Sequence, residues 1–161
     1  YALKAIGFQT GCGFMVGTPF QTTEMLADEL AFLTQFKPHM AGIGPFLPHR
    51  DTPFKDFGGG SVQTTLKMLA LSRLLCPEIL LPATTALGTA AAGGRERGIL
   101  AGANVVMPNL SPASCREKYS IYDNKLNTGA ESSEGLAELA ARMKKIGRVL
   151  ATCRGDSLVK N

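Results

Sequence analysis

The stretch GCGFMVGTPFQTTEMLADEL, residues 11–30, decides how the chain is interpreted. It fits either a glycine-rich loop that cradles a phosphate or an apolar strand followed by a helix. A dinucleotide-binding loop needs G-x-G-x-x-G at the turn between strand and helix, and a P-loop needs Gly-Lys-Ser/Thr. Here Gly11, Gly13 and Gly17 are spaced G-x-G-x-x-x-G, and the first two precede the apolar run. The spacing favours a strand whose small residues let neighbouring strands and a ligand come close.

The alternation of apolar strand and amphipathic helix continues to about residue 110. Thr22 and Ser61 are expected to cap two helices, and a third, short helix is expected at 94–102. The apolar face of the helix after Ser61 is expected to consist of Leu66, Leu69, Ala70 and Leu74. Further strands are predicted at 39–44, 78–86 and 103–109, and a glycine-rich loop is expected between the second of these and the short helix. Strands that are apolar throughout and alternate with helices indicate a parallel sheet covered on its outer face. Four such units are half of a (β/α)8 barrel, although a four-stranded doubly wound sheet fits the same periodicity.

The alternation of strands and helices ends at about residue 110. A last amphipathic helix runs from Leu136 to Ile146 and is closed by Gly147, and residues 148–152 read as a short terminal strand. We therefore expect one domain in two parts: residues 1–110 as the half-barrel, and residues 111–161 as a cavity-closing loop with a C-terminal helical extension. The opening YALKAIG reads as the tail of a helix, which indicates a fragment or a processed product.

Composition excludes several classes of protein. The 161 residues are 45% apolar and 19% charged, which is typical of a globular domain, and the net charge of +4 is spread too widely to predict nucleic-acid binding. No apolar run approaches the roughly 20 residues that span a bilayer, and no signal peptide is visible. The four cysteines lie far apart without a C-x-x-C pair, so we expect reduced thiols and no metal site within this chain.

Candidate site residues come from the predicted strand ends, because the carboxyl ends of barrel strands build the active site. Thr84 and Thr85 follow an apolar strand and offer two hydroxyls there, although capping explains them equally well. Methionines recur near strand ends and fit either a core or a cavity for a partly apolar ligand. His39 and His49 stand alone and are interpreted as structural or exposed. The PHRD segment is interpreted as a charged rim in which Arg50 pairs with Asp51, and GRERG, at 94–98, as a connector and helix start rather than an anion site.

Five blocks of sequence resemble successive segments of the FeFe-hydrogenase maturase HydE family. They are GCGFMVGTPFQT (11–22), MAGIGPFLPHRDTP (40–53), LLPATTALGT (80–89), GRERGILAGANVVMPN (94–109) and SPASCREKYSIYDNK (111–125). The resemblance keeps their order and spacing from about residue 6 to residue 127, and so is far more specific than any single motif. That family consists of radical S-adenosylmethionine enzymes of the biotin-synthase type, built on a complete (β/α)8 barrel. The resemblance therefore implies the C-terminal half of such a barrel.

The family's 4Fe-4S cluster is held by a Cys-x3-Cys-x2-Cys loop near the first barrel strand. The resemblance places that loop upstream of Tyr1, so this chain alone is expected to be inactive and to hold no metal. Some members carry a second, dispensable cluster after the YDNK segment. Asn127, Gly135 and Glu138 stand where its cysteines are expected, so that cluster should be missing even in the whole protein.

The resemblance also implies roles for individual residues. Those expected to border the S-adenosyl-L-methionine cosubstrate are Met15, Gly44, Pro45, Phe46 and Leu47. Those expected to line the inner substrate cavity are Met40, Thr84, Thr85, Met107, Tyr119 and Tyr122. The hydroxyls of the threonines would hold anionic groups of the substrate, and the tyrosines would close the cavity near the ribose and the reacting sulfur.

The function implied is maturation of the diiron subcluster of FeFe hydrogenase, through reductive cleavage of S-adenosylmethionine to a 5′-deoxyadenosyl radical. The expected partners are a small-molecule or organometallic iron substrate and other hydrogenase maturases, with no nucleic acid and no membrane. The expected location is the cytoplasm, or an organelle in a eukaryote. Two alternatives remain: a methylornithine synthase or biotin synthase-like enzyme of the same superfamily, and a noncatalytic half-barrel that binds a partner.

Overall fold

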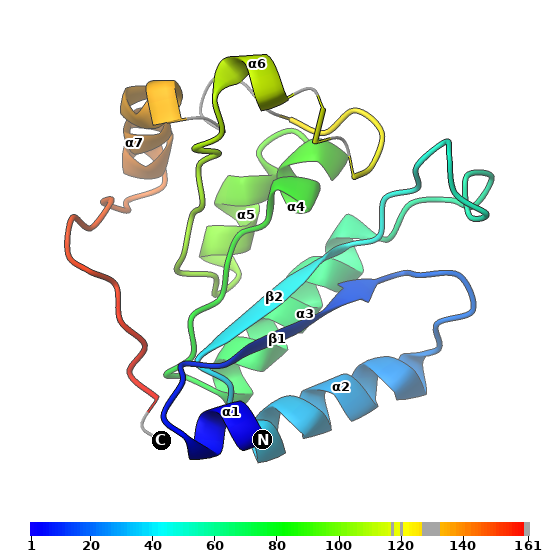
Figure 1. Ribbon diagram of the computed structural model, residues 1–161, viewed down its shortest axis with the longest axis vertical. Coiled ribbons are helices and arrows are strands. Elements are labelled where there is room, and N and C mark those ends of the chain that lie inside the picture. The colour runs from blue at the N-terminus through cyan, green and yellow to red at the C-terminus, as the bar shows by residue number, and fades with distance from the viewer. Residues whose placement is uncertain (117, 120, 127–132, 160–161) are drawn as a thin grey trace.

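The computed structural model describes residues 1–116, 118–119, 121–126 and 133–159 (Figure 1). It combines a two-stranded parallel sheet with helices. In chain order the elements are α1 (Ala2–Ala5), β1 (Gly11–Val16), α2 (Thr23–Phe36), β2 (Met40–Pro45), α3 (Val62–Leu75), α4 (Thr85–Ala90), α5 (Gly94–Leu100), α6 (Ala113–Arg116), a 3-10 turn η2 (Ser133–Gly135) and α7 (Leu136–Lys145).

The opening stretch forms strand β1, as its spacing predicts. It pairs with β2 in register, so that Gly13 lies opposite Gly42. Gly17 ends the strand with a φ of 81°, a conformation that suits glycine. The side chain of Gln21 fixes this turn, because it accepts a hydrogen bond from Gly17 N at 2.6 Å and donates one to Met15 O at 2.9 Å.

Two predicted caps begin the two long helices. Thr22 Oγ1 accepts a hydrogen bond from Met25 N at 3.3 Å before α2, and Ser61 Oγ accepts one from Thr64 N at 3.2 Å before α3. Both helices run for 14 residues and contact each other, and α3 also packs on β2. The α2–α3 pair therefore covers one face of the sheet.

The third and fourth predicted strands are extended but make only isolated parallel bridges. Leu80 and Ala83 bridge to β2, and Val105 bridges to Pro82. The four extended segments thus neighbour one another in chain order, the order that a (β/α)8 barrel uses, whereas a doubly wound sheet reverses direction at a switch point. This order favours the barrel interpretation, and the half-barrel itself stays a prediction.

The two faces of the β1–β2 ladder differ in burial. Along both strands, successive residues alternate between covered and open faces, as the two-residue period of a strand requires. The covered face supplies Val16, Ala41 and Ile43 to the hydrophobic core, which also contains Leu33 of α2 and Leu69 of α3. The open face carries Gly11, Gly13, Met15, Met40, Gly42 and Gly44.

Several expectations were wrong in detail. Helix α4 occupies a segment that was read as the strand end and a glycine-rich loop, because Thr84 caps it through a hydrogen bond from Leu87 N. Leu74, placed on the apolar face of α3, is 78% exposed. Residues 148–152 form no strand. By contrast, residues 94–98 begin helix α5 as expected, and Gly94 is closely packed there, since a Cβ on Gly94 would lie 2.0 Å from Leu87 O.

The C-terminal part follows its prediction more closely. Helix α7 buries Leu139 and Met143 in the core and is followed by Gly147 at a φ of 71°. Arg142 pairs with Glu96 of α5, which joins α7 to the helices beside the sheet. The tail then runs back along the molecule toward α1 (Figure 1). Among the described residues, no helix combines the length and apolar character needed to cross a membrane.

Candidate ligand-binding cavity

A concave cavity of about 630 Å³ opens on the uncovered face of β1 and β2. Its volume falls within the range of sites for small molecules and cofactors. The lining residues come from both strands, the loop after β2, the start of α4 and the segment before residue 126: Gly13, Phe14, Met15, Gly42, Gly44, Pro45, Phe46, Leu47, His49, Thr52, Phe54, Thr84, Ala86, Ile121 and Tyr122. All five residues expected to border the cosubstrate are thus brought together, with two of those expected to line the substrate cavity.

Glycines make the floor of this cavity. A Cβ on Gly13 would lie 2.2 Å from the carbonyl oxygen of Gly42, and a Cβ on Gly44 would lie 2.7 Å from Thr84 Oγ1. Gly42, by contrast, has open space where its Cβ would be. Two of these glycines therefore allow close packing of the floor, and the third keeps volume for a ligand.

The two predicted threonines have different positions. Thr84 lines the cavity and its Oγ1 accepts a hydrogen bond from Leu87 N at 3.3 Å, so the capping role and the cavity position coincide. While it accepts that bond, the hydroxyl can still donate its hydrogen to a ligand. Thr85 is the first residue of α4, is half-buried, and does not line the cavity.

The loop after β2 forms one wall through a tight turn at residues 49–52. His49 O accepts hydrogen bonds from Thr52 N at 3.0 Å and from Thr52 Oγ1 at 2.8 Å. His49 Nδ1 accepts one from Asp51 N at 3.1 Å. Beyond the turn, the rings of Phe46 and Phe54 meet edge to face with centroids 6.4 Å apart. The wall thus combines a fixed turn with aromatic surface.

Residues 121–126 close the cavity from the other side, and Tyr122 is buried there with 9% exposure. The predicted Arg50–Asp51 pair is wrong, because Arg50 pairs instead with Asp123, far along the chain. Arg50 Nε donates to Asp123 Oδ1 at 3.1 Å, and Arg50 N donates to Asp123 Oδ2 at 3.2 Å. Asp123 N in turn donates to Pro48 O at 3.2 Å. We call these three hydrogen bonds the Arg50–Asp123 clamp.

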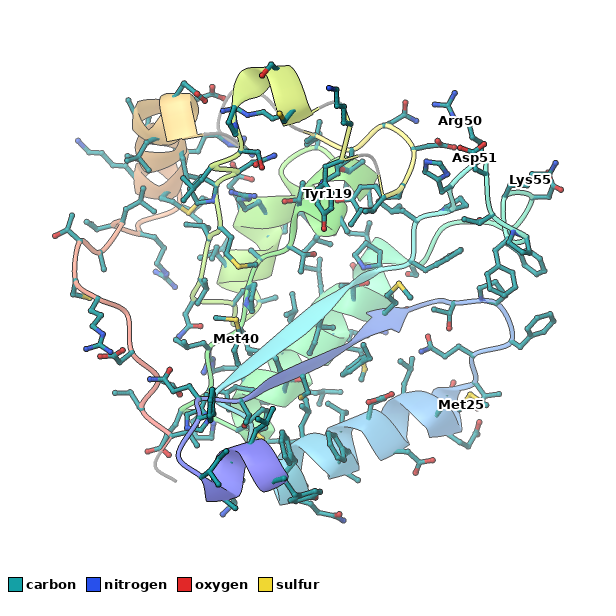
Figure 2. All side chains as sticks on the ribbon, in the orientation of Figure 1. Met25, Met40, Arg50, Asp51, Lys55 and Tyr119 are labelled. Atoms are coloured by element: carbon teal, nitrogen blue, oxygen red, sulfur yellow. The ribbon has the colours of Figure 1, made fainter. Side chains whose placement is uncertain are left out.

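Three other predicted residues lie outside this cavity. Tyr119 is 59% exposed, and Lys125 holds its ring, with Nζ 3.9 Å from the ring centroid. Met107 is half exposed. Met40 lies at the start of β2, far from Tyr119 (Figure 2), and lines a separate hollow of about 500 Å³ with residues of the C-terminal tail. Of the six predicted cavity residues, Thr84 and Tyr122 therefore line the cavity on the open face, Met40 lines the second hollow, and Thr85, Met107 and Tyr119 line neither.

The residues present do not fit an iron–sulfur cluster. Cys76 is buried and Cys12 half-buried, and burial raises the pKa of both thiols, which opposes thiolate ligation. No group of three potential metal ligands occurs among the residues that the structure describes. Of the positions compared with a second cluster, Gly135 precedes α7, Glu138 lies in its first turn, and Asn127 lies outside the described residues.

His39 is structural, as predicted. It is buried, and its Nδ1 accepts a hydrogen bond from Thr10 N at 3.0 Å. His49 and the Arg50–Asp123 clamp were not predicted as parts of the site. For His49 and Arg50 the available signal was their place in the loop after a barrel-type strand, where functional side chains concentrate. No such signal marked Asp123.

The arrangement can bind a partly apolar ligand. Of the described residues that line the cavity, none carries a carboxylate, ammonium or guanidinium group. Hydroxyls, one imidazole and backbone groups are its polar contacts, and aromatic, aliphatic and methionine side chains supply the rest. Such a surface can orient a ligand through a few polar contacts.

Comparison with known proteins gives a consistent result. No family model matches the chain. It is 49% identical over 124 residues to the FeFe-hydrogenase maturase subunit HydE of Thermotoga maritima, a match covering 77% of this chain and 36% of the maturase. It is 31% identical over 110 residues to the 3-methylornithine synthases of Methanosarcina barkeri and Methanosarcina acetivorans, covering 68% of this chain and 30% of each synthase.

The fold agrees with the sequence. The crystal structure of methylornithine synthase, PylB, superimposes with a TM-score of 0.73 and 27% identity, covering 92% of this chain and 42% of that chain. The chain spans about a third of the length of the curated relatives it matches. The resemblance predicted from the motifs is confirmed: this chain is a relative of HydE and methylornithine synthase within the radical S-adenosylmethionine family.

Proposed function

We propose that this chain is part of a radical S-adenosylmethionine enzyme that matures the diiron subcluster of FeFe hydrogenase. The reaction class is reductive cleavage of S-adenosylmethionine to a 5′-deoxyadenosyl radical, acting on a small-molecule or organometallic iron substrate alongside other maturases. The observation that carries the proposal is 49% identity to HydE, well above the 31% identity to the methylornithine synthases.

Within that enzyme, the open face of β1 and β2 would hold the cosubstrate. The five residues proposed to border it are Met15, Gly44, Pro45, Phe46 and Leu47, and the cavity they share supports this role. Thr84 and Tyr122 would contact the bound molecules from α4 and the closing segment. Thr85, Met40, Met107 and Tyr119 would complete the cavity only when the remaining length of the relatives is present. The 4Fe-4S ligands would come from outside this chain, which by itself should form no 5′-deoxyadenosine.

The test is anaerobic assay of the intact protein with its cluster reconstituted. We expect 5′-deoxyadenosine formation from S-adenosylmethionine, together with activation of apo-hydrogenase when the other maturases are present. Replacing Thr84 and Thr85 together with valine should impair hydrogenase activation, whereas Thr34→Val, on the outer helix α2, should leave activation unchanged. Because the double variant also loses the Thr84 cap of α4, worth about 1 kcal/mol, thermal unfolding is measured beside activation to show that the variant is still folded. Failure of the wild-type protein to activate the hydrogenase would reject the proposed function.

A methylornithine synthase activity is the second candidate, favoured by the superposition on PylB over 92% of this chain. The same reconstituted protein distinguishes the two candidates, because formation of 3-methylornithine without hydrogenase activation would select the synthase. A biotin synthase-like activity would give neither result.

The remaining candidate is a noncatalytic binding module. One edge of β1 is free of strand partners among the described residues, and such edges invite pairing with another chain. A soluble, monomeric 161-residue product found in cells, without a longer form, would favour this candidate over the enzyme.

A further inference from the structure

His49 lines the large cavity but has no role in the proposed reaction so far. Its side chain is 18% exposed, so the ring is reachable from the cavity and is still held by its surroundings. The turn at residues 49–52 fixes its backbone through the two hydrogen bonds that Thr52 donates to His49 O. A ring held in this way is ready to contact a ligand without further ordering.

The hydrogen bond at Nδ1 defines which ring nitrogen carries the proton. Asp51 N donates to His49 Nδ1 at 3.1 Å, and a backbone N–H can donate only to an unprotonated ring nitrogen. The Asp51 carboxylate lies at 3.7 Å from the same nitrogen, longer than a hydrogen bond. The neutral ring therefore carries its hydrogen on Nε2. Within the part of the chain that the structure describes, Nε2 has no hydrogen-bond partner.

The surroundings indicate what Nε2 can bind. Since Nδ1 is bonded within its own loop, Nε2 is the ring nitrogen that remains available to a ligand in the cavity that His49 lines. The other polar side chains in the lining, Thr52, Thr84 and Tyr122, are also uncharged. A neutral donor on such a wall matches an uncharged acceptor, since an ionic group would lack a charged partner there.

We propose that His49 is a ligand-binding residue whose Nε2–H donates to an uncharged acceptor, a hydroxyl oxygen or ring nitrogen, in the nucleoside part of the cosubstrate. This inference rests on the proposed function, because it takes the cavity ligand to be S-adenosylmethionine. It adds a side-chain contact to a cosubstrate border otherwise made of backbone and apolar groups.

Two substitutions separate ligand binding from loop structure. His49→Asn keeps an acceptor where Nδ1 stands, able to receive the hydrogen bond from Asp51 N, but has no donor where Nε2 stands. His49→Gln places an amide donor near the Nε2 position and loses the Nδ1 acceptor. Dissociation constants for S-adenosylmethionine, and for 5′-deoxyadenosine as a competitor, are measured on the intact, cluster-loaded protein, with thermal unfolding as the check on folding.

We expect His49→Asn to weaken both ligands by the same factor, about tenfold, and His49→Gln to stay within about threefold of the wild type. Three outcomes would overturn the inference and leave the proposed function standing, provided that the wild type binds S-adenosylmethionine. They are wild-type affinity in both variants, the same loss of affinity in both, and a loss of affinity in His49→Gln alone. A loss confined to S-adenosylmethionine would overturn the nucleoside assignment. Absence of wild-type binding would overturn the proposed function together with the inference.

Discussion

The side chains of the twelve residues in the β1–β2 ladder alternate between two faces, and the two faces have different roles. The face toward α2 and α3 is closed by branched and aliphatic side chains, with Ile43 and Ala41 completely buried. The face toward the cavity is mostly glycine, and its one large side chain on β1, Met15, is 53% exposed. The covered face holds the fold together, and the open face keeps room for a ligand.

This difference shows how a parallel strand can serve stability and binding at once. Side chains alternate across a strand, so each function can be set by every second residue. The open face gives up apolar burial, and its glycines add conformational entropy to the unfolded chain. Stability must then come from the helix-covered side, while the cavity side depends on close backbone approach and on a few polar contacts.

The largest effect is expected from the covered face. Ile43→Ala removes a fully buried side chain between β2 and the helices and should lower the free energy of unfolding by about 3–4 kcal/mol. Met15→Ala, on the open face, should cost less than about 1 kcal/mol because the side chain is half exposed. Urea unfolding followed by circular dichroism measures both, and equal losses would contradict the division of work between the faces.

The second effect tests the open face itself, using two glycines that lie opposite each other. Gly13→Ala places a Cβ 2.2 Å from the carbonyl oxygen of Gly42, so the ladder must separate, and we expect a loss of about 2 kcal/mol or more. Gly42→Ala meets open space and should cost less than about 1 kcal/mol. If thermal unfolding shows the two variants to be alike, close approach of the strands is not what Gly13 provides.

Local signals in the sequence predicted the first two strands, the caps of α2 and α3 and the order of the extended segments. Gly11, Gly13 and Gly17 were placed correctly because strand and turn chemistry act over a few residues. Thr22 and Ser61 were recognised as caps for the same reason. The position of Leu74 was missed, since its exposure depends on where neighbouring helices end, and helical periodicity does not contain that information.

The candidate site was predictable only in part. The residues directly after β1 and β2 could be grouped, because the ends of parallel strands meet at one edge of a sheet. The partner of Arg50 could not be predicted, since Asp123 lies 73 positions away and the neighbouring Asp51 carries the same charge. Tyr119 does not join Tyr122 in lining the cavity of this chain, and its ring contacts Lys125 instead. Contacts of this kind follow from the tertiary fold.

The third prediction concerns the ion pair that joins α7 to α5. Arg142 hydrogen-bonds to the Glu96 carboxylate of α5, and this bond, the first among several causes, lowers the pKa of Glu96 from its ordinary value of 4.5. A lowered pKa in the folded state means that the stabilisation is complete above the ordinary pKa and is lost as pH falls through the lowered one. Glu96→Gln should therefore cost about 1–2 kcal/mol at pH 7, and progressively less below about pH 4.5. A loss that is the same at pH 7 and pH 3 in urea unfolding would show that the charge of Glu96 contributes nothing, and no loss at either pH would show that α7 is held by packing alone.

The smallest effect on stability is expected where the open face is closed. Arg50 is 76% exposed, so the Arg50–Asp123 clamp should add less than about 1 kcal/mol to global stability. Asp123→Asn should nevertheless raise hydrogen exchange severalfold in the peptide covering residues 121–126, because the carboxylate that receives both Arg50 donors is lost. Asp51→Asn, on the same turn but outside the clamp, is the matched control and should leave that exchange unchanged.

Since the Arg50–Asp123 pair is solvent-exposed, added salt should raise hydrogen exchange of this peptide in the wild type and hardly change it in Asp123→Asn. If hydrogen exchange of this peptide in the wild type does not depend on salt, burial of Tyr122 holds the segment in place. The cavity side would then be closed by apolar burial, as the covered face is.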